Sequence, residues 1–227
     1  MSASNAAAVV EWAAREWKTD RVILLPDEYL AKNVAAQTGI HIIAWHGRCE
    51  VHERFTAEDI AELREAHPGV IVLAHPECPP DVMAAADFAG STAALQDYVV
   101  EKQPRKVVLL TECSMSDNVA QYAPNVDFVR PCNLCPHMKR ITLEGIYDAL
   151  AEMKHEVTIP EDVRVRAKLA IQRMLDLPKE KPRAFDTGRA PVATMHLPNS
   201  TSCGHCWNAA LDIAALGIAG RPIPPLD

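Results

Sequence analysis

The chain has 227 residues, 48% of them hydrophobic and 23% charged, and its 30 acidic side chains outnumber the 23 basic ones. This length supplies enough apolar surface for the core of one large domain or two small ones. The net charge of −7 excludes binding to nucleic acid over a broad surface. No apolar run approaches the roughly 20 residues of a membrane-spanning helix, and residues 1–5 lack the basic and apolar regions of a signal peptide. We therefore expect a cytoplasmic protein with no nucleic-acid or membrane partner.

Short, largely apolar segments alternate with amphipathic helical patterns. Residues 21–25, 70–74 and 106–110 are rich in β-branched side chains, and each run stops at a polar residue or a proline. The spacing after the first run predicts a helix that ends near Gly39. This alternation is typical of a parallel sheet covered by helices on both faces. We therefore predict an α/β fold.

Polar side chains follow the predicted strands: Asp27 after the first, His75 and Glu77 after the second, and Glu112 after the third. In parallel sheets, ligands bind at the carboxyl ends of the strands. The sequence thus predicts a site at this edge. Asp27 and Glu112 are more typical of loops and helix caps than of chemistry, and His75-Pro76 by itself is most simply a strand terminator.

The chain also contains an internal repeat. The matching pairs are residues 21–27 with 106–112 and residues 33–35 with 118–120, both at an offset of 85. Each unit continues through a second short strand, at 42–44 or 127–129, to Cys49 or Cys135. Two copies of one α/β unit therefore place two cysteines equivalently, although chance similarity between two strand–helix units is the alternative.

The first unit is shorter than the second. Cys49 and Cys135 are 86 residues apart, so the first unit lacks about 37 residues at its front, including the strand equivalent to 70–74. We expect an unpaired edge and an uncovered apolar face there, and a chain that starts inside a domain. The predicted divisions are a truncated unit at 1–49, a complete unit at 50–136, helices at 137–178, and a tail with a CxxC motif at 179–227.

Two helices are predicted in the segment that follows the repeat. Thr142 is a suitable N-cap for the first. The second runs from about Pro160 to Leu175, with acidic residues at its positive N-terminal end.

The seven cysteines are expected to be metal ligands or free thiols rather than disulfides. A CxxC pair places two thiolates near one ion, whereas widely spaced cysteines at the ends of equivalent units fit an iron–sulfur cluster. Cys78 and Cys113 are most simply partly buried thiols. For Cys132, a spare thiol and a metal ligand are equally good interpretations, and Cys203-x-x-Cys206 is a metal site, a redox pair or a spare motif.

Taken together, these motifs resemble the quinolinate synthase (NadA) family of bacterial NAD biosynthesis. The resemblance runs from about residue 2 to 176. The matching segments are Pro26-Asp27-x-x-Leu30-Ala31, Gly47-Arg48-Cys49-x-Val51-His52, His75-Pro76-Glu77-Cys78, Ala86-Asp87-x-x-Gly90-Ser91-Thr92, Thr111-Glu112 and Cys135-x-x-Met138-Lys139-x-Ile141-Thr142-Leu143.

The resemblance implies three similar α/β domains about a pseudo-threefold axis, each giving one cysteine to a single [4Fe–4S] cluster. It implies a transferase that condenses iminoaspartate with dihydroxyacetone phosphate to quinolinate, with the cluster as Lewis acid. Cys49 and Cys135 match two cluster ligands, and the third has no counterpart in this chain. The implied partners are these two small-molecule substrates, L-aspartate oxidase as the supplier of iminoaspartate, and a separate N-terminal fragment.

The resemblance also implies roles for the polar residues. His75 and Glu77 are the implied catalytic residues, and together with Pro76 they hold the substrate. Ser91 and Thr92 at a helix start suit a phosphate or carboxylate, with an ordinary N-cap as the alternative.

Two further substrate contacts are implied less directly. His52 is a substrate or supporting contact, with an exposed helix-start histidine as the alternative. Ser4 is carried over where the family has its serine one position earlier, at Ala3.

We expect little or no activity from the isolated chain. The alternatives are a non-catalytic zinc module built on Cys132, Cys135, Cys203 and Cys206, and a subunit that completes a split enzyme.

Overall fold

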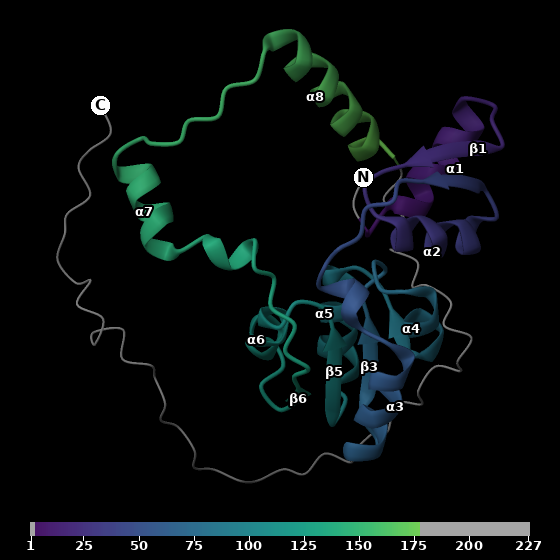
Figure 1. Cartoon of the computed structure of the whole chain (residues 1–227), viewed down its shortest axis with the longest axis vertical. Helices are drawn as coiled ribbons and strands as arrows, with labels where there is room; N and C mark the ends of the chain where they lie inside the picture. Colours follow the sequence, from purple (N-terminus) through teal and green to yellow (C-terminus); the bar gives the residue numbers. More distant parts are fainter. Residues whose placement is uncertain (1–2, 178–227) are drawn as a thin grey trace. The chain divides into compact units, whose positions relative to one another are not determined.

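The computed structural model describes residues 3–177. It contains two parallel sheets (Figure 1). The first is built by β1 (Arg21–Leu24) and β2 (His41–Ala44), which are adjacent in register from Arg21 beside His41 to Leu24 beside Ala44. Helix α1 (Ala6–Glu16) precedes β1, and α2 (Glu28–Thr38) connects the two strands.

The second sheet has the strand order β4-β3-β5-β6, and all its neighbouring strands are parallel. Its strands are β3 (Ile71–Ala74), β4 (Phe88–Ala89), β5 (Lys106–Leu110) and β6 (Asp127–Val129). The helices around it are η1 (His52–Arg54), α3 (Ala57–Ala66), α4 (Pro80–Ala85), α5 (Thr92–Lys102) and α6 (Ser114–Ala120). The predicted α/β class is therefore confirmed.

The core follows from the alternation of side chains along β3 and β5. Val72 and Ala74 of β3 belong to one buried cluster, whereas Leu73 between them belongs to another. In β5, Val108 and Leu110 join the first cluster, and Val107 and Leu109 join the second. Successive side chains of a strand point to opposite faces. Both faces of this sheet are thus covered, as predicted.

The smaller sheet corrects that prediction. Its side chains alternate as well, but only one face packs against the core, because Ile23 and Ile43 are 69% and 45% exposed. The general prediction that helices cover both faces is therefore wrong for β1 and β2. The more specific expectation, that the shortened first unit has an uncovered apolar face, agrees with the exposed Ile23 and Ile43. The pseudo-threefold arrangement and the domain divisions stay predictions.

Local signals set the helix ends. Asp27 caps α2, and Gly39 ends it in a left-handed conformation with φ of 70°. Thr142 accepts a hydrogen bond from Gly145 N (3.0 Å) at the start of α7 (Leu143–Ala151), as predicted. Helix α7 follows η2 (Met138–Arg140) and precedes α8 (Glu161–Leu175).

The final two helices differ from the others because neither contains a buried residue. No helix among the described residues combines the length and the apolar composition required to cross a bilayer.

Candidate functional site

Four side chains from three segments meet in one largely buried group. His75 and Glu77 follow β3, Thr111 follows β5, and His52 lies in η1 after the smaller sheet. Nδ1 of His52 is 3.1 Å from Oε2 of Glu77, and Nε2 of the same ring is 3.0 Å from Oγ1 of Thr111. The ring of His75 stacks on that of His52, with centroids 4.3 Å apart. The candidate site therefore lies at the carboxyl ends of the strands, where the sequence places it.

His52 is the centre of this group. Only 7% of its surface is exposed, so the alternative of an exposed helix-start histidine is wrong. Its contact with Thr111 joins residues 59 positions apart in the chain. Sequence reasoning did not single out Thr111, although it belongs to a matching Thr111-Glu112 segment.

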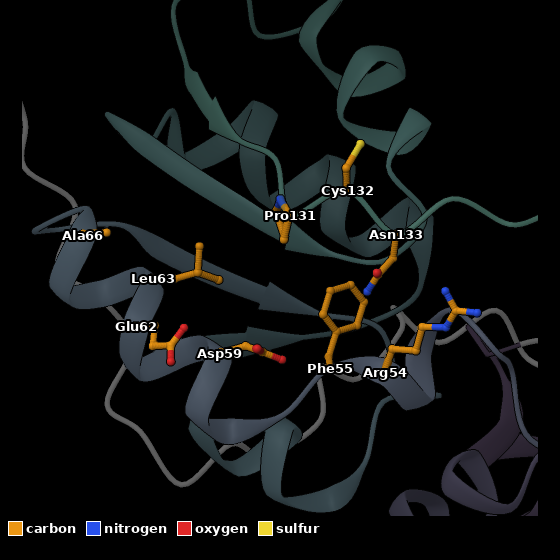
Figure 2. Close-up of a pocket in the computed structure, with 9 residues that line it drawn as sticks. All are labelled: Arg54, Phe55, Asp59, Glu62, Leu63, Ala66, Pro131, Cys132 and Asn133. Carbon is orange, nitrogen blue, oxygen red and sulfur yellow. The ribbon is translucent and has the colours of Figure 1, made fainter.

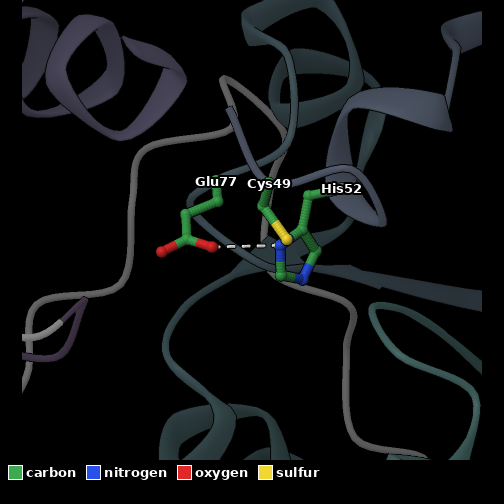
Figure 3. A group of neighbouring side chains, drawn as sticks. All are labelled: Cys49, His52 and Glu77. Atoms are coloured by element: carbon green, nitrogen blue, oxygen red, sulfur yellow. Dashed lines mark hydrogen bonds and ion pairs between the residues drawn. The ribbon is translucent and has the colours of Figure 1, made fainter. Parts of the chain in front are cut away.

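Cys49 lies beside His52 and Glu77 (Figure 3). Its backbone N–H donates to Oδ2 of Asp27 at 3.0 Å, while Oδ1 of the same carboxylate accepts from Leu30 N at 2.7 Å. Asp27 thus caps α2 and also fixes the backbone of Cys49. The expectation that Asp27 serves caps and loops is confirmed.

The charges of the group are coupled. Burial opposes protonation of His52, but hydrogen bonds to Cys49 and Glu77 outweigh it and raise its pKa to about 9. The hydrogen bond with His52 lowers the pKa of the Cys49 thiol, and another lowers that of Glu77, in each case against the effect of burial. Burial, assisted by the charge on His52, lowers the pKa of His75 to about 4. At neutral pH the group therefore pairs a charged His52 with a carboxylate and keeps His75 neutral.

Asn33 of α2 holds the loop that carries His75 and Glu77. Its side-chain N–H group donates to the carbonyl oxygens of Pro76 (2.8 Å) and Cys78 (3.0 Å). Asn33 is itself buried. This positioning residue was missed because an asparagine within a helical pattern gives no signal of a partner 43 residues away.

Ser91 and Thr92 lie at the same edge as His75. They follow β4, which pairs with β3 up to the Ala74–Ala89 position. Oγ of Ser91 accepts a hydrogen bond from Ala94 N at 3.3 Å, so the N-cap role is present. Ser91 is buried, whereas Thr92 is exposed. Ser4 is an exposed residue of the turn before α1.

The cysteines divide into three kinds. Cys78 is fully buried, and burial raises the pKa of its thiol, which confirms the buried-thiol interpretation. Cys49 and Cys135 are free and half-buried, and both pack against the larger of the two core clusters. Cys113 and Cys132 form a disulfide with their Cα atoms 5.1 Å apart.

This disulfide corrects two sequence predictions. Cys113 is not a free thiol, and Cys132 is neither a spare thiol nor a metal ligand. The residues meet because β5 and β6 are neighbours, so the segments after them are adjacent, and Cys113 N donates to Asn133 O at 3.1 Å. Cys203 and Cys206 lie outside the described residues.

A cavity of about 430 Å³ lies near the disulfide (Figure 2). Of the residues that the sequence singled out, Cys132 lines it, whereas the proposed catalytic and substrate-binding residues do not. The lining residues are Arg54, Phe55, Asp59, Glu62, Leu63, Ala66, Pro131, Cys132 and Asn133.

Cys49 and Cys135 have the donor chemistry that an iron–sulfur cluster needs. Both thiols are free and half-buried, and the neighbouring residues Glu50 and His137 approach each other to 3.6 Å. Thiolates are the usual ligands of such clusters, and the lowered pKa of Cys49 favours that form. Among the described residues, Cys49 and Cys135 therefore have the chemistry of two thiolate ligands of such a cluster.

The fold and the site together define a parallel α/β protein with a cysteine, two histidines and a glutamate at its strand ends. A family model described as NadA, quinolinate synthetase A protein, matches residues 1–176. The chain belongs to this family.

Individual relatives support the family. The chain is 60% identical over 190 residues to a quinolinate synthase of Caulobacter vibrioides (strain NA1000 / CB15N), covering 83% of this chain and 52% of the relative. It is 67% identical over 174 residues to quinolinate synthase 1 of Mesorhizobium japonicum, covering 77% and 52% of the two proteins. A quinolinate synthase of Agrobacterium fabrum is 61% identical over 176 residues, with coverages of 78% and 50%. The chain thus spans about half the length of these curated relatives.

Proposed function

We propose that this chain is part of a cytoplasmic quinolinate synthase that condenses iminoaspartate with dihydroxyacetone phosphate, releasing phosphate and water. The family supports the reaction class. The observation that carries the proposal is the contact of Glu77, His52 and His75 with one another beside Cys49, because it combines proton-transfer groups with a thiolate ligand.

Cys49 and Cys135 would hold two positions of a [4Fe–4S] cluster, and the third thiolate would come from a segment outside this chain. When bound, the cluster would supply an iron with an open position as a Lewis acid for a substrate oxygen or nitrogen. L-aspartate oxidase is the proposed supplier of iminoaspartate.

Glu77 is the proposed general base. Its carboxylate is kept ionised by the His52 contact, and it is about one-quarter exposed, so it can reach a substrate proton. His75 is neutral at physiological pH and can therefore accept a hydrogen bond from a substrate hydroxyl or donate one to a carbonyl. Pro76 gives the loop between them its rigidity.

Ser91 and Thr92 are proposed to bind a phosphate or carboxylate at the start of α5, where free backbone N–H groups converge. The cap made by Ser91 is compatible with that role, since it uses the hydroxyl as an acceptor and leaves its proton available. Ser4 before α1 is the proposed equivalent contact from the first unit.

The experiment compares cysteine variants after anaerobic reconstitution of the chain together with the N-terminal half of the Caulobacter relative. We expect Cys49→Ser and Cys135→Ser to lose most bound iron and sulfide and all quinolinate formation. Cys78→Ala is the matched control, because its thiol is buried and should hold no iron. Equal iron retention in all three variants would contradict the cluster assignment.

The isolated chain is expected to have little or no turnover, because one side of the site would be open to water. Full quinolinate formation without the N-terminal half would refute this. An unchanged inactivity after mixing would count against a subunit that completes a split enzyme.

The zinc module based on two CxxC motifs is less well supported. Cys132 is bound to Cys113 and cannot act as a thiolate ligand in this state.

A further inference from the structure

Three potential ligand atoms converge on one point of the described structure. Sγ of Cys49, a ring nitrogen of His52 and a carboxylate oxygen of Glu77 all lie within 4.8 Å of one another. Figure 3 shows the side chains of Cys49 and Glu77 directed toward Nδ1 of the His52 ring. Cys135 is not a member of this group.

We propose that Cys49, His52 and Glu77 form a site for a single Zn²⁺ ion. This ligand set differs from that of the cluster but shares Cys49 with it, so the ion and the cluster cannot be bound at the same time. Thiolate, imidazole and carboxylate are the three ligand types of protein zinc sites. Three protein ligands leave the fourth position to water or a small anion. The proposal goes beyond the proposed function and does not depend on it.

The separations suit a tetrahedral ion. Zinc bonds of about 2.0–2.3 Å in tetrahedral geometry place ligand atoms roughly 3.3–3.8 Å apart. Nδ1 of His52 is 3.1 Å from Oε2 of Glu77, and the three potential ligand atoms all lie within 4.8 Å of one another. Side-chain movements of an ångström or less would therefore complete the geometry without displacing the backbone.

The surroundings of His52 determine which nitrogen would bind. Nε2 is occupied by Oγ1 of Thr111 at 3.0 Å. Because a hydrogen bond to that hydroxyl keeps the proton on Nε2, a bound ion would displace the proton of Nδ1, the nitrogen that faces Glu77, and take its lone pair. The stacked His75 ring limits rotation of the His52 ring. Histidine ligands of protein-bound metals usually have such a hydrogen bond from the other ring nitrogen, which fixes the orientation of the ring.

The other two ligands are also held. Asp27 accepts a hydrogen bond from Cys49 N, and Asn33 fixes the backbone on both sides of Glu77. The three ligands come from two segments whose positions are set by the fold, so the site is formed before the ion arrives.

The test is a Co²⁺ titration of the metal-free 227-residue chain that carries Cys203→Ser and Cys206→Ser, with Zn²⁺ as the competitor. These substitutions remove the CxxC motif that lies outside the described residues. Omitting reductant keeps Cys132 in its disulfide. The readouts are the stoichiometry and the thiolate-to-cobalt charge-transfer band, neither of which requires iron, sulfide or activity.

We expect one Co²⁺ per chain, displaced by Zn²⁺. The charge-transfer band should disappear in Cys49→Ser, and the affinity should fall at least about tenfold in His52→Gln and in the isosteric Glu77→Gln. Thr111→Val should weaken binding by about 10–100-fold, because it removes the partner of Nε2. Cys135→Ser and His67→Ala are the controls that should bind as tightly as the parent chain.

Two results would overturn the proposal. One is a band that survives Cys49→Ser or vanishes in Cys135→Ser, which would place the ion elsewhere. The other is unchanged affinity in both His52→Gln and Glu77→Gln, with circular dichroism showing that the variants are folded. Failure of the cluster reconstitution would leave the cobalt result intact, and the reverse also holds.

Discussion

Replacement of Asn33 by alanine tests the coupling between α2 and the loop that carries His75 and Glu77. The change removes the donor to two carbonyl oxygens, those of Pro76 and Cys78. A buried polar group left without its partner costs about 1–3 kcal/mol, so two such groups predict a loss of about 2–6 kcal/mol of unfolding free energy. This is a large part of the roughly 5–15 kcal/mol that stabilises a typical domain.

The matched control is Gln37→Ala, one turn further along the same helix. Gln37 also has a side-chain amide, but its Oε1 is buried without a hydrogen-bond partner among the described residues. Its removal should therefore change stability by less than about 1 kcal/mol. Urea unfolding followed by circular dichroism measures both variants, and Asn33→Ser, which retains a single donor, should lie between them. Equal stability of the alanine variants would refute the role of Asn33.

The remaining predictions concern Cys49 and the disulfide. Asp27→Asn keeps one acceptor for the cap but places an amide N–H against Cys49 N–H, so we expect a cost of about 1–3 kcal/mol. Thr56→Ala, which removes only the cap of α3, should cost about 1 kcal/mol in the same urea assay, and a smaller effect of Asp27→Asn would contradict the bond. Replacing Cys113 and Cys132 by serine opens a loop with a sequence separation of 19 and should cost about 3 kcal/mol. Reductant should lower the urea midpoint of the parent chain but not of this variant, and a parent midpoint insensitive to reductant would exclude a stabilising bridge.

The sequence by itself determined the local elements. A run rich in β-branched residues predicts a strand at 106–110, and the repeat predicts a second short strand at 127–129. The structure has β5 and β6 at these bounds. Thr142 and Gly39 mark helix ends because their side-chain oxygen and backbone freedom act on adjacent residues. The two-residue β4 was not predicted, since so short a segment has no measurable periodicity.

The sequence also determined much of the site's composition. Parallel strands present their carboxyl ends at one edge, so the sequence alone places His75 and Glu77 there. The internal repeat singled out Cys49, the family resemblance added His52, and the comparisons confirm the family.

Only the tertiary structure decided which of these groups touch. The pairing of β3 with β5 places Thr111 beside the segment that follows β3, and there it contacts His52 of η1. Asn33 of α2 contacts the loop that carries Pro76 and Cys78. The pairing of β5 with β6 places the segments after these strands side by side, so Cys113 and Cys132 form a disulfide, against the expectation of free thiols. Local sequence encodes backbone conformation over a few residues, whereas these contacts span 19 to 59 residues. They exist because burial of the apolar strand faces fixes the order of the strands, and that order has no local signal.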